Sequence, residues 1–570
     1  MKEYLRETES LLSEPVALPV RPEQSIGAGA RGTTAPEWLS RLSPWFGTIL
    51  GTLIFLPTLW YGFVWDDRYA IVTNASLRSW KTLAQILWGK MDATVSMYRP
   101  VTGSIVFFQF HLFGLHPWGY HLTSILFHAL ACALIFRVAL QLSGKRSVAL
   151  FASLLFAVHD THLEAVAWVS ALAEPLVVSA ILAGFIAYLR YRQERQWKWL
   201  AAISGCLFFG LLTKETAIVL PLLLLAYEFT FGDSGSRTLR RNLPLLAALS
   251  STVCVYLVMR YFAYKGFIYN ESRLPFHVLF FTWPSLLVTY ARHLLFPTSL
   301  SPFYDSNYVV AANWSFWLPL AMLIAIAGAA FFISKRLAGG ALIQFCTLGM
   351  VISIIPALDL SIFQYREIMH DRFLYLPSVF FAIMVSYLLF GTHEGKDDGA
   401  HSSVGAKRSA TAYAALGACL VILHGAGLLI QSPVWRNDLA LYSYAVQIAP
   451  GNARPAFTLA EEYLERGDLP QAERLLDHVV RLVPAPRAFE LLGQTRLHMG
   501  NAQAAEEPLR RAIAAAPDRP GQHAMLGQCL LRLGRTDEAN VEFRTETALS
   551  RGLQTQTPLQ QLPQLPDAKP

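Results

Sequence analysis

The chain of 570 residues has few charged side chains for its length. Asp, Glu, Lys and Arg make up 15% of the residues and hydrophobic types 54%, whereas about a quarter of a soluble protein is charged. The shortage is uneven, because 13% of the first 431 residues are charged against 22% of the 139 that begin at Ser432. This distribution excludes a single soluble domain. It predicts a membrane part followed by a near-neutral soluble part.

Cysteines are also few, and their positions do not suggest a disulfide framework. Five of the six lie in apolar stretches, and Cys529 stands alone in the C-terminal part. The net charge of +7 comes from Lys and Arg in short loops between apolar runs, as the positive-inside rule expects, so we expect no nucleic-acid partner. Residues 1–43 are polar and lack the cationic start and early apolar core of a signal peptide. We therefore predict that they form a mobile cytoplasmic arm.

Apolar runs long enough to cross a bilayer, about 20 residues each, are abundant between residues 44 and 431. About eleven spans are predicted: 44–65, 119–142, 146–158 (short), 163–189, 198–213, 216–232, 242–262, 314–334, 340–357, 373–391 and 410–431. Basic loops such as Lys145/Arg146 and Lys335/Arg336 mark the cytoplasmic side. The segment 276–296 is apolar but contains Arg292 and His293. Counting it as a span would place Lys335 outside, so we expect a helix on, or dipping into, the outer face.

This topology places the N-terminus inside and the C-terminal part outside, in the periplasm if the membrane is a bacterial inner membrane. It also gathers unusual polar residues at the outer face, and charges at such depths tend to be functional or paired. They are Asp66, Asp67, Arg68, Tyr98, Arg99, His159, Asp160, His162, Glu164, Lys214, Glu215, Tyr365, Arg366, Glu367, His370, Asp371 and Arg372. In the first outer loop an apolar stripe at helical spacing predicts a helix in the interface with its apolar face in lipid. The stripe consists of Leu77, Trp80, Leu83, Ile86 and Leu87.

The C-terminal part repeats every 33 or 34 residues when it is aligned on Gly467, Gly500 and Gly534. Small residues recur at matching helical positions, for example Ala472, Ala505 and Ala539, where paired helices approach closely. This is the spacing of tetratricopeptide (TPR) repeats, so we predict an all-α TPR solenoid over 432–553. Stacked repeats serve for packing and assembly, or offer a concave surface to a peptide or acceptor. Residues 554–570 are rich in Gln and Pro and are predicted to be disordered.

An apolar enzyme with acidic groups at its outer surface suits a lipid-borne substrate whose head lies at the interface, such as a polyprenyl-phosphate sugar. A carboxylate must take the proton of the acceptor hydroxyl, or orient it, and cations must stabilise the leaving phosphate. Asp66 and Asp67 are the candidate catalytic carboxylates, with Asp67 favoured as the one that faces the cavity. The candidate donor-phosphate ligands are Arg99, Lys214, Arg366, Arg372 and Tyr375. The candidate acceptor or structural network comprises His159, His162, Glu164, Glu215 and Asp371.

Five motifs occur in a fixed order: Trp65-Asp66-Asp67, Tyr98-Arg99-Pro100, His162-Leu163-Glu164-Ala165-Val166-Ala167, Lys214-Glu215, and Arg372-Phe373-Leu374-Tyr375-Leu376-Pro377-Ser378. In this order, and with a TPR array after the last span, the chain resembles the transmembrane-and-TPR O-mannosyltransferases and their bacterial relatives, of the GT-C superfamily, over roughly residues 44–550. The resemblance implies a GT-C membrane fold, a catalytic acidic motif in the first outer loop and a polyprenyl-phosphate sugar donor. One departure is His159-Asp160, where the relatives have His-Pro.

Other interpretations of these residues stay open at this stage. Asp66 and Asp67 could simply end the first span in water, and Lys214 could pair with Glu215 rather than bind the donor. Arg372 and Tyr375 could be interfacial anchors. His159, His162 and Glu164 could bind a divalent metal ion, although no second cluster of ligands accompanies them. Two other classes of protein remain, an O-antigen-ligase-like transferase and a transporter or assembly scaffold with a TPR dock. The sugar and the acceptor, a protein or a glycan, are not specified by the sequence.

Overall fold

The computed structural model describes residues 37–89, 97–232, 236–264, 274–337, 339–363, 367–392 and 404–554. Every regular element in these ranges is a helix. The predicted arm lies outside them except for residues 37–43, which form the first turns of α2 (Glu37–Phe55). The predicted disordered tail lies outside them after Gln554. The prediction that the membrane part and the C-terminal part are both all-α is therefore confirmed for the described residues.

The membrane part is built from helices that cover all of the predicted spans. They are α2, α5 (Pro117–Ser143), α6 (Arg146–Val158), α7 (Leu163–Ala167), α8 (Ala173–Glu194), α9 (Trp197–Thr213), α10 (Val219–Phe231), α11 (Ser236–Tyr264), α13 (Trp314–Arg336), α14 (Gly340–Ile354), α15 (Pro377–Ser386) and α16 (Val404–Gln431). Among the described residues, six segments are long and apolar enough to cross a membrane. Five further apolar helices are shorter, including those at 146–158, 197–213 and 377–391. The chain is thus an integral membrane protein, and helix length alone supports fewer full spans than the eleven predicted.

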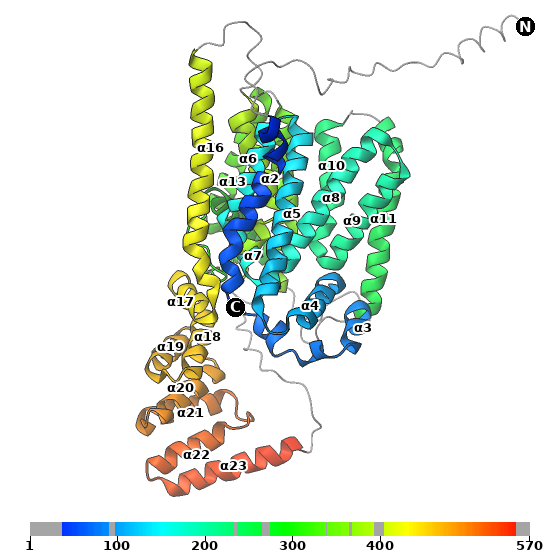
Figure 1. Ribbon diagram of the computed structural model, residues 1–570. Helices are drawn as coiled ribbons and strands as arrows, with labels where there is room; N and C mark the ends of the chain where they lie inside the picture. Colours follow the sequence, from blue (N-terminus) through cyan, green and yellow to red (C-terminus); the bar gives the residue numbers. More distant parts are fainter. Residues whose placement is uncertain are drawn as a thin grey trace, which may run out of the picture. The chain divides into compact units, whose positions relative to one another are not determined.

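The spanning helices divide into central and peripheral ones. In the apolar window of the segment Val169–Glu194, which contains α8, 83% of the residues are buried, whereas only 6% are buried in α13. Figure 1 shows α5, α8 and α9 side by side, and α8 contacts both neighbours. Gly184 of α8 leaves room for Leu220, because a Cβ there would lie 2.8 Å from that side chain. A helix that is apolar all round and buried belongs to the core of the bundle, so α8 forms its centre and α13 borders the lipid.

The segment between α2 and α5, predicted as the first outer loop, contains two helices that pack against each other. α3 (Lys81–Trp88) follows the short helix η3 (Ala75–Arg78), and α4 (Pro100–Phe113) is an apolar helix that was not predicted as a span. Leu77 and Ile86 are buried against Phe107 of α4, whereas Trp80 is exposed. The predicted interfacial stripe is therefore split. Leu77 and Ile86 pack against α4, whereas the exposed Trp80 is free to lie at the membrane–water interface.

The segment predicted on the outer face forms α12 (Phe276–Leu295). Its polar end does not face water, because His293 is fully buried in contact with Asp371. The helix packs against α13 and against the short helix η9 (Asp371–Leu374). It therefore connects the segment that contains η9 to the helix bundle.

The C-terminal part consists of α17 (Asp438–Ile448) followed by three helix pairs. The pairs are α18 (Ala453–Glu465) with α19 (Leu469–Leu482), α20 (Pro486–His498) with α21 (Ala502–Ala515), and α22 (Gln522–Arg532) with α23 (Thr536–Gln554). Gly467, Gly500 and Gly534 follow the first helix of each pair with φ of 78°, 83° and 77°, a conformation that favours glycine. The 33- or 34-residue repeat thus marks real helix hairpins. α16 continues through the short helix η11 (Ser432–Arg436) directly into this array.

Candidate functional site

The candidate site begins at a sharp bend after the first apolar helix. Trp65 has φ = 56°, which is a genuine outlier for a bulky residue and persists only where the surroundings fix it. Its ring stacks on Trp168 with centroids 4.5 Å apart and lies 5.0 Å from Phe303. Its amide nitrogen donates to Asp438 Oδ1 at 2.8 Å. The bend sends the next two carboxylates in different directions.

Asp67 is fully buried and its oxygens are engaged. Oδ1 accepts hydrogen bonds from the amide and hydroxyl of Ser170 at 2.8 and 2.5 Å, and Oδ2 accepts from the Val64 amide at 3.1 Å. Burial raises the pKa of Asp67 to about 7, although these hydrogen bonds oppose the shift. The prediction that Asp67 faces an open cavity is therefore wrong. This carboxylate joins the segment that follows α2 to Ser170, near the start of the segment Val169–Glu194.

Asp66 is the exposed member of the pair. Within the described part of the chain its carboxylate has no hydrogen bond or ion pair, and only its backbone oxygen accepts bonds from the following turn. The surrounding protein partly desolvates it and raises its pKa, while the positive charges of Arg454 and Arg372 lower it. Asp66 is thus a solvent-accessible carboxylate that two arginines influence. A general base needs such access to an acceptor hydroxyl.

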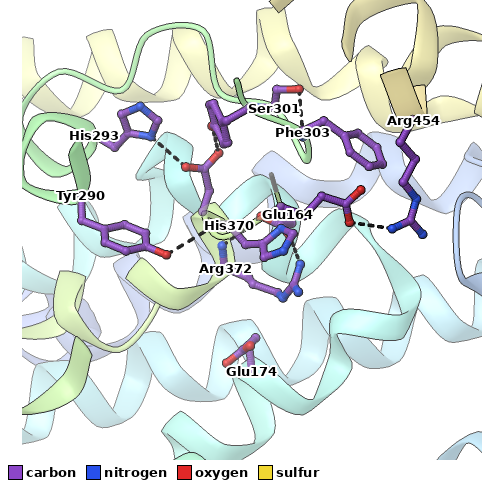
Figure 2. A network of polar contacts seen from close by, with 12 residues as sticks. Glu164, Glu174, Tyr290, His293, Ser301, Phe303, His370, Arg372 and Arg454 are labelled. Carbon is purple, nitrogen blue, oxygen red and sulfur yellow. Dashed lines mark hydrogen bonds and ion pairs between the residues drawn. The ribbon is translucent and has the colours of Figure 1, made fainter. Parts of the chain in front are cut away.

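Arg372, whose charge influences Asp66, lies among aromatic rings and beside the buried Glu164. Its guanidinium carbon is 5.1 Å from the Trp168 ring centroid and 5.9 Å from that of Trp65, distances at which a cation is attracted to the ring face. Its side chain donates to Glu164, whose other oxygen accepts from the Arg372 amide at 3.1 Å. Figure 2 shows these two side chains facing each other, with His370 beside them.

Three further ion pairs join neighbouring ends of α4, α8, α9 and α11. Arg99 donates to Glu215 Oε2 through Nε at 3.1 Å and Nη2 at 2.9 Å, and Arg260 of α11 lies 3.8 Å from the other oxygen of Glu215. Lys214 is buried and pairs with Glu174 at the start of α8. The interpretation of Lys214 and Glu215 as a mutual pair is therefore wrong. Two arginines share Glu215, so that cluster carries a surplus positive charge.

Asp371 belongs to a separate buried network. Its Oδ1 accepts from His293 Nδ1 at 2.8 Å and its Oδ2 accepts from the Tyr304 hydroxyl at 2.5 Å. Arg292 donates to His293 Nε2 at 2.9 Å. Because an arginine can only donate, Nε2 must accept and the ring proton lies on Nδ1. Asp371 therefore anchors α12, and both of its oxygens are in use.

His159, His162 and Tyr375 are core residues in this structure. His159 contacts Thr161 and the Leu294 carbonyl at 2.9 and 3.2 Å. His162 contacts Ser378 at 2.7 Å, and the fully buried Tyr375 contacts His128 at 2.8 Å. The prediction that Tyr375 binds the donor phosphate disagrees with this position. His159 and His162 therefore fit the structural interpretation that the sequence left open, and Tyr375, which is fully buried, is not an interfacial anchor either.

Asp160, the departure from the family motif, accepts from His424 Nδ1 of α16 at 2.9 Å, and it thereby joins the loop to the last membrane helix. Arg366 lies outside the described residues. Among those that the structure describes, no group of three or more His, Cys, Asp or Glu side chains is placed to hold a metal ion.

Four residues of the site were not predicted from the sequence. Glu174 and Arg260 are charges inside long apolar runs, and that signal could have revealed both. Asp438 and Arg454 belong to the C-terminal array, and no local signal connects them with the membrane part. Arg454, labelled in Figure 2, donates a hydrogen bond from Nη1 to Oε2 of Glu367 at 2.6 Å.

The site thus combines one exposed carboxylate, Asp66, with two arginines, Arg372 and Arg454, that influence its charge. The cations are held by carboxylates or aromatic rings, so their positions are fixed before any ligand arrives. Arg372 and Arg99 keep about a sixth and a fifth of their side-chain surface exposed, enough for contact with a ligand. Such an arrangement can take a proton at Asp66 and stabilise negative charge at the arginines.

Comparisons with known proteins agree with this division of the chain. Residues 99–261 match the family described as dolichyl-phosphate-mannose-protein mannosyltransferase, and residues 457–520 match the tetratricopeptide repeat. The crystal structure of ArnT from Cupriavidus metallidurans bound to undecaprenyl phosphate aligns over 90% of this chain and 89% of that chain, with 17% identity and a TM-score of 0.36. A TM-score this low does not establish a shared fold.

Named relatives are similar to this chain over different fractions of its length, from about a third to three quarters. Protein O-mannosyl-transferase Tmtc2 of Drosophila melanogaster is 32% identical over 222 residues, which are 36% of this chain and 24% of that protein. Protein O-mannosyl-transferase F38B6.6 of Caenorhabditis elegans is 24% identical over 461 residues, 76% of this chain and 62% of that protein. TMTC4 of Mus musculus is 26% identical over 71% of this chain and 62% of that protein. The chain thus spans less than two thirds of these relatives. The resemblance to the transmembrane-and-TPR O-mannosyltransferases, predicted from motif order, is confirmed by sequence similarity in both parts of the chain.

Proposed function

We propose that this protein is a GT-C-type glycosyltransferase that moves a sugar from a polyprenyl-phosphate donor to a hydroxyl acceptor on a protein or glycan. The observation that carries the proposal is Asp66, an accessible carboxylate without a side-chain partner in the described chain, under the influence of two arginines. The similarity to named O-mannosyl-transferases supports the same reaction class. Mannose is accordingly the first sugar to test.

In the proposed reaction the acceptor oxygen attacks the anomeric carbon of the donor sugar. The bond between that carbon and the phosphate oxygen breaks, the electron pair stays on the phosphate, and the acceptor proton passes to Asp66. Arg372 and Arg99 stabilise the phosphate charge. Lys214 is buried against Glu174, so it contributes to the local field rather than direct contact.

We place this reaction at the outer face of the membrane, with the N-terminus inside and the C-terminal array in the periplasm of a bacterial cell. The arrangement of basic loops supports this orientation. The array shares a side with Asp66, because Asp438 contacts Trp65 directly. Reporter fusions made after Gln431 should be active only outside the cytoplasm, and activity only in the cytoplasm would contradict the orientation.

The central experiment is a transfer assay with the full chain in detergent or liposomes. The donor is radiolabelled mannose linked to a polyprenyl phosphate. The acceptors are peptides that contain Ser and Thr. The parent should label the acceptor and release polyprenyl phosphate, while Asp66→Asn should not. A chelator arm tests for dependence on a divalent cation, and a panel of other sugars tests donor choice. No transfer from any polyprenyl-phosphate sugar to protein or glycan acceptors would reject the proposal.

Mass spectrometry of periplasmic glycoproteins from a deletion strain and its parent identifies the natural acceptor. The TPR array is proposed to hold that acceptor on its concave surface, as stacked repeats commonly do. The loss of one set of glycopeptides, with the remaining glycoproteins unchanged, is the expected result. An unchanged glycoprotein profile would contradict an acceptor in that compartment.

A further inference from the structure

The first helix of the C-terminal array reaches back to the bend that carries Asp66. Asp438, the first residue of α17, accepts a hydrogen bond from the Trp65 amide with Oδ1 at 2.8 Å, across 373 sequence positions. Its Oδ2 lies 3.3 Å from Arg68 Nε. The Asp438 side chain is buried and both oxygens are engaged within the protein. It is therefore placed to hold the loop rather than to bind a passing peptide.

The loop that contains Asp66 is fastened to the array on both sides. On one side Trp65 is bound by Asp438. On the other side Arg68 pairs with Glu462 at 2.8 Å and Glu465 at 3.4 Å, both on α18. Asp66 lies between these two attachments and has none of its own in the described chain. Its direction is consequently set by the backbone on either side of it.

The left-handed conformation of Trp65 makes this support necessary. A non-glycine residue in this region is strained, and it remains there only when neighbouring groups over-determine its position. The ring of Trp65 is held by Trp168 and Phe303, whereas its amide is held by Asp438. Loss of the amide contact would free the backbone to relax, and a rotation at residue 65 would swing Asp66 away from the arginines.

We propose that Asp438 is a positioning residue, and that α17 of the array holds Trp65 in its left-handed conformation and thereby aims the Asp66 carboxylate. The array is then a part of the transferase site and not only a dock for the acceptor. The effect of Asp438 on catalysis depends on the proposed function, in which Asp66 is the base. The contact itself can be tested without any substrate.

The first experiment measures amide hydrogen exchange by mass spectrometry on the full chain. Asp438→Ala should speed exchange in peptides covering residues 64–70 by about tenfold or more. Asp438→Asn should change it little, because the amide oxygen can still accept from Trp65. The matched control is Asp477→Asn, which removes a similar pairing with Arg496 inside the array and should leave this segment unchanged. Unchanged exchange in Asp438→Ala would overturn the proposal.

The second experiment separates positioning from docking. Asp438→Ala should lower kcat by about 10- to 100-fold, the scale of a misplaced reacting group, with KM for donor and acceptor within about twofold. Asp438→Asn should recover most of the rate, and Asp477→Asn should match the parent. A raised acceptor KM with parental kcat would overturn positioning in favour of docking. If exchange rises as expected but the parent transfers no sugar, the proposed function fails while the hold of α17 on the loop stands.

Discussion

The two adjacent aspartates should separate cleanly into one that serves catalysis and one that serves stability. Asp66→Asn replaces an exposed side chain without a partner in the described chain, so the free energy of unfolding should change by no more than about 0.5 kcal/mol. The transfer rate should fall by about 100-fold or more, the scale of lost general-base help. That loss corresponds to about 2.7 kcal/mol of transition-state free energy.

Asp67→Ala should show the opposite pattern. It leaves three donors without their acceptor, namely the Ser170 amide, the Ser170 hydroxyl and the Val64 amide. At about 1 kcal/mol or more for each unsatisfied buried group, the cost is about 3 kcal/mol of stability. The variant that remains folded should still transfer sugar, because Asp66 is intact.

The assay pairs thermal unfolding of the purified protein in detergent with the rate of transfer per folded molecule. Asp66→Asn should unfold at the parental temperature and transfer poorly, whereas Asp67→Ala should unfold at a clearly lower temperature. Parental transfer by Asp66→Asn would refute the reasoning. So would an Asp67→Ala variant that is as stable as the parent and inactive, since that result would return catalysis to the buried carboxylate.

Three more outcomes follow from the charges around Asp66. Arg372→Ala should raise the KM for the lipid donor at least tenfold in a transfer assay, and Arg372→Lys should restore it only in part, because lysine lacks the planar fork that binds two phosphate oxygens. Arg454 lowers the pKa of Asp66, so Arg454→Gln should raise that pKa, and a pH–rate profile should show the loss of transfer on the acid side beginning at a higher pH. Lys214→Met leaves Glu174 charged and buried, which should cost about 3–5 kcal/mol in thermal or denaturant unfolding, and adding Glu174→Gln should recover much of that loss; parental stability of the single variant would contradict the pairing.

The helices of this protein were predictable because they depend on local properties of the sequence. Apolar length locates α5 or α14, and the spacing of Gly467, Gly500 and Gly534 locates the hairpins of the array. The number of full spans was less predictable, since a helix such as α6, with 13 residues, is apolar but short of a bilayer's thickness. Burial against neighbours, which separates α8 from α13, depends on packing that hydropathy does not report.

Many residues of the site could be named from the sequence, but four of them, and the partners of the others, could not. Lys214 and Glu215 are adjacent, yet Lys214 has an extended backbone with φ = −159°, and successive side chains of an extended chain point to opposite sides. Lys214 therefore pairs with Glu174, 40 positions away. Glu215 pairs with Arg99, 116 positions away. The choice between Asp66 and Asp67 depended on the left-handed bend at Trp65, for which a tryptophan gives no signal.

The contact between Asp438 and Trp65 also has a consequence for how such chains can be recombined. A TPR array looks like an interchangeable module, and Gln431 looks like the natural place to cut it from the membrane helices. α17 and α18 bind the residues on either side of Asp66. In a chimera joined at Gln431, these two helices would come from a different protein than the loop, so their contacts with the loop would not match. Exchange between relatives should therefore succeed only when the junction lies beyond α18, so that the two helices stay with the membrane part that they fit.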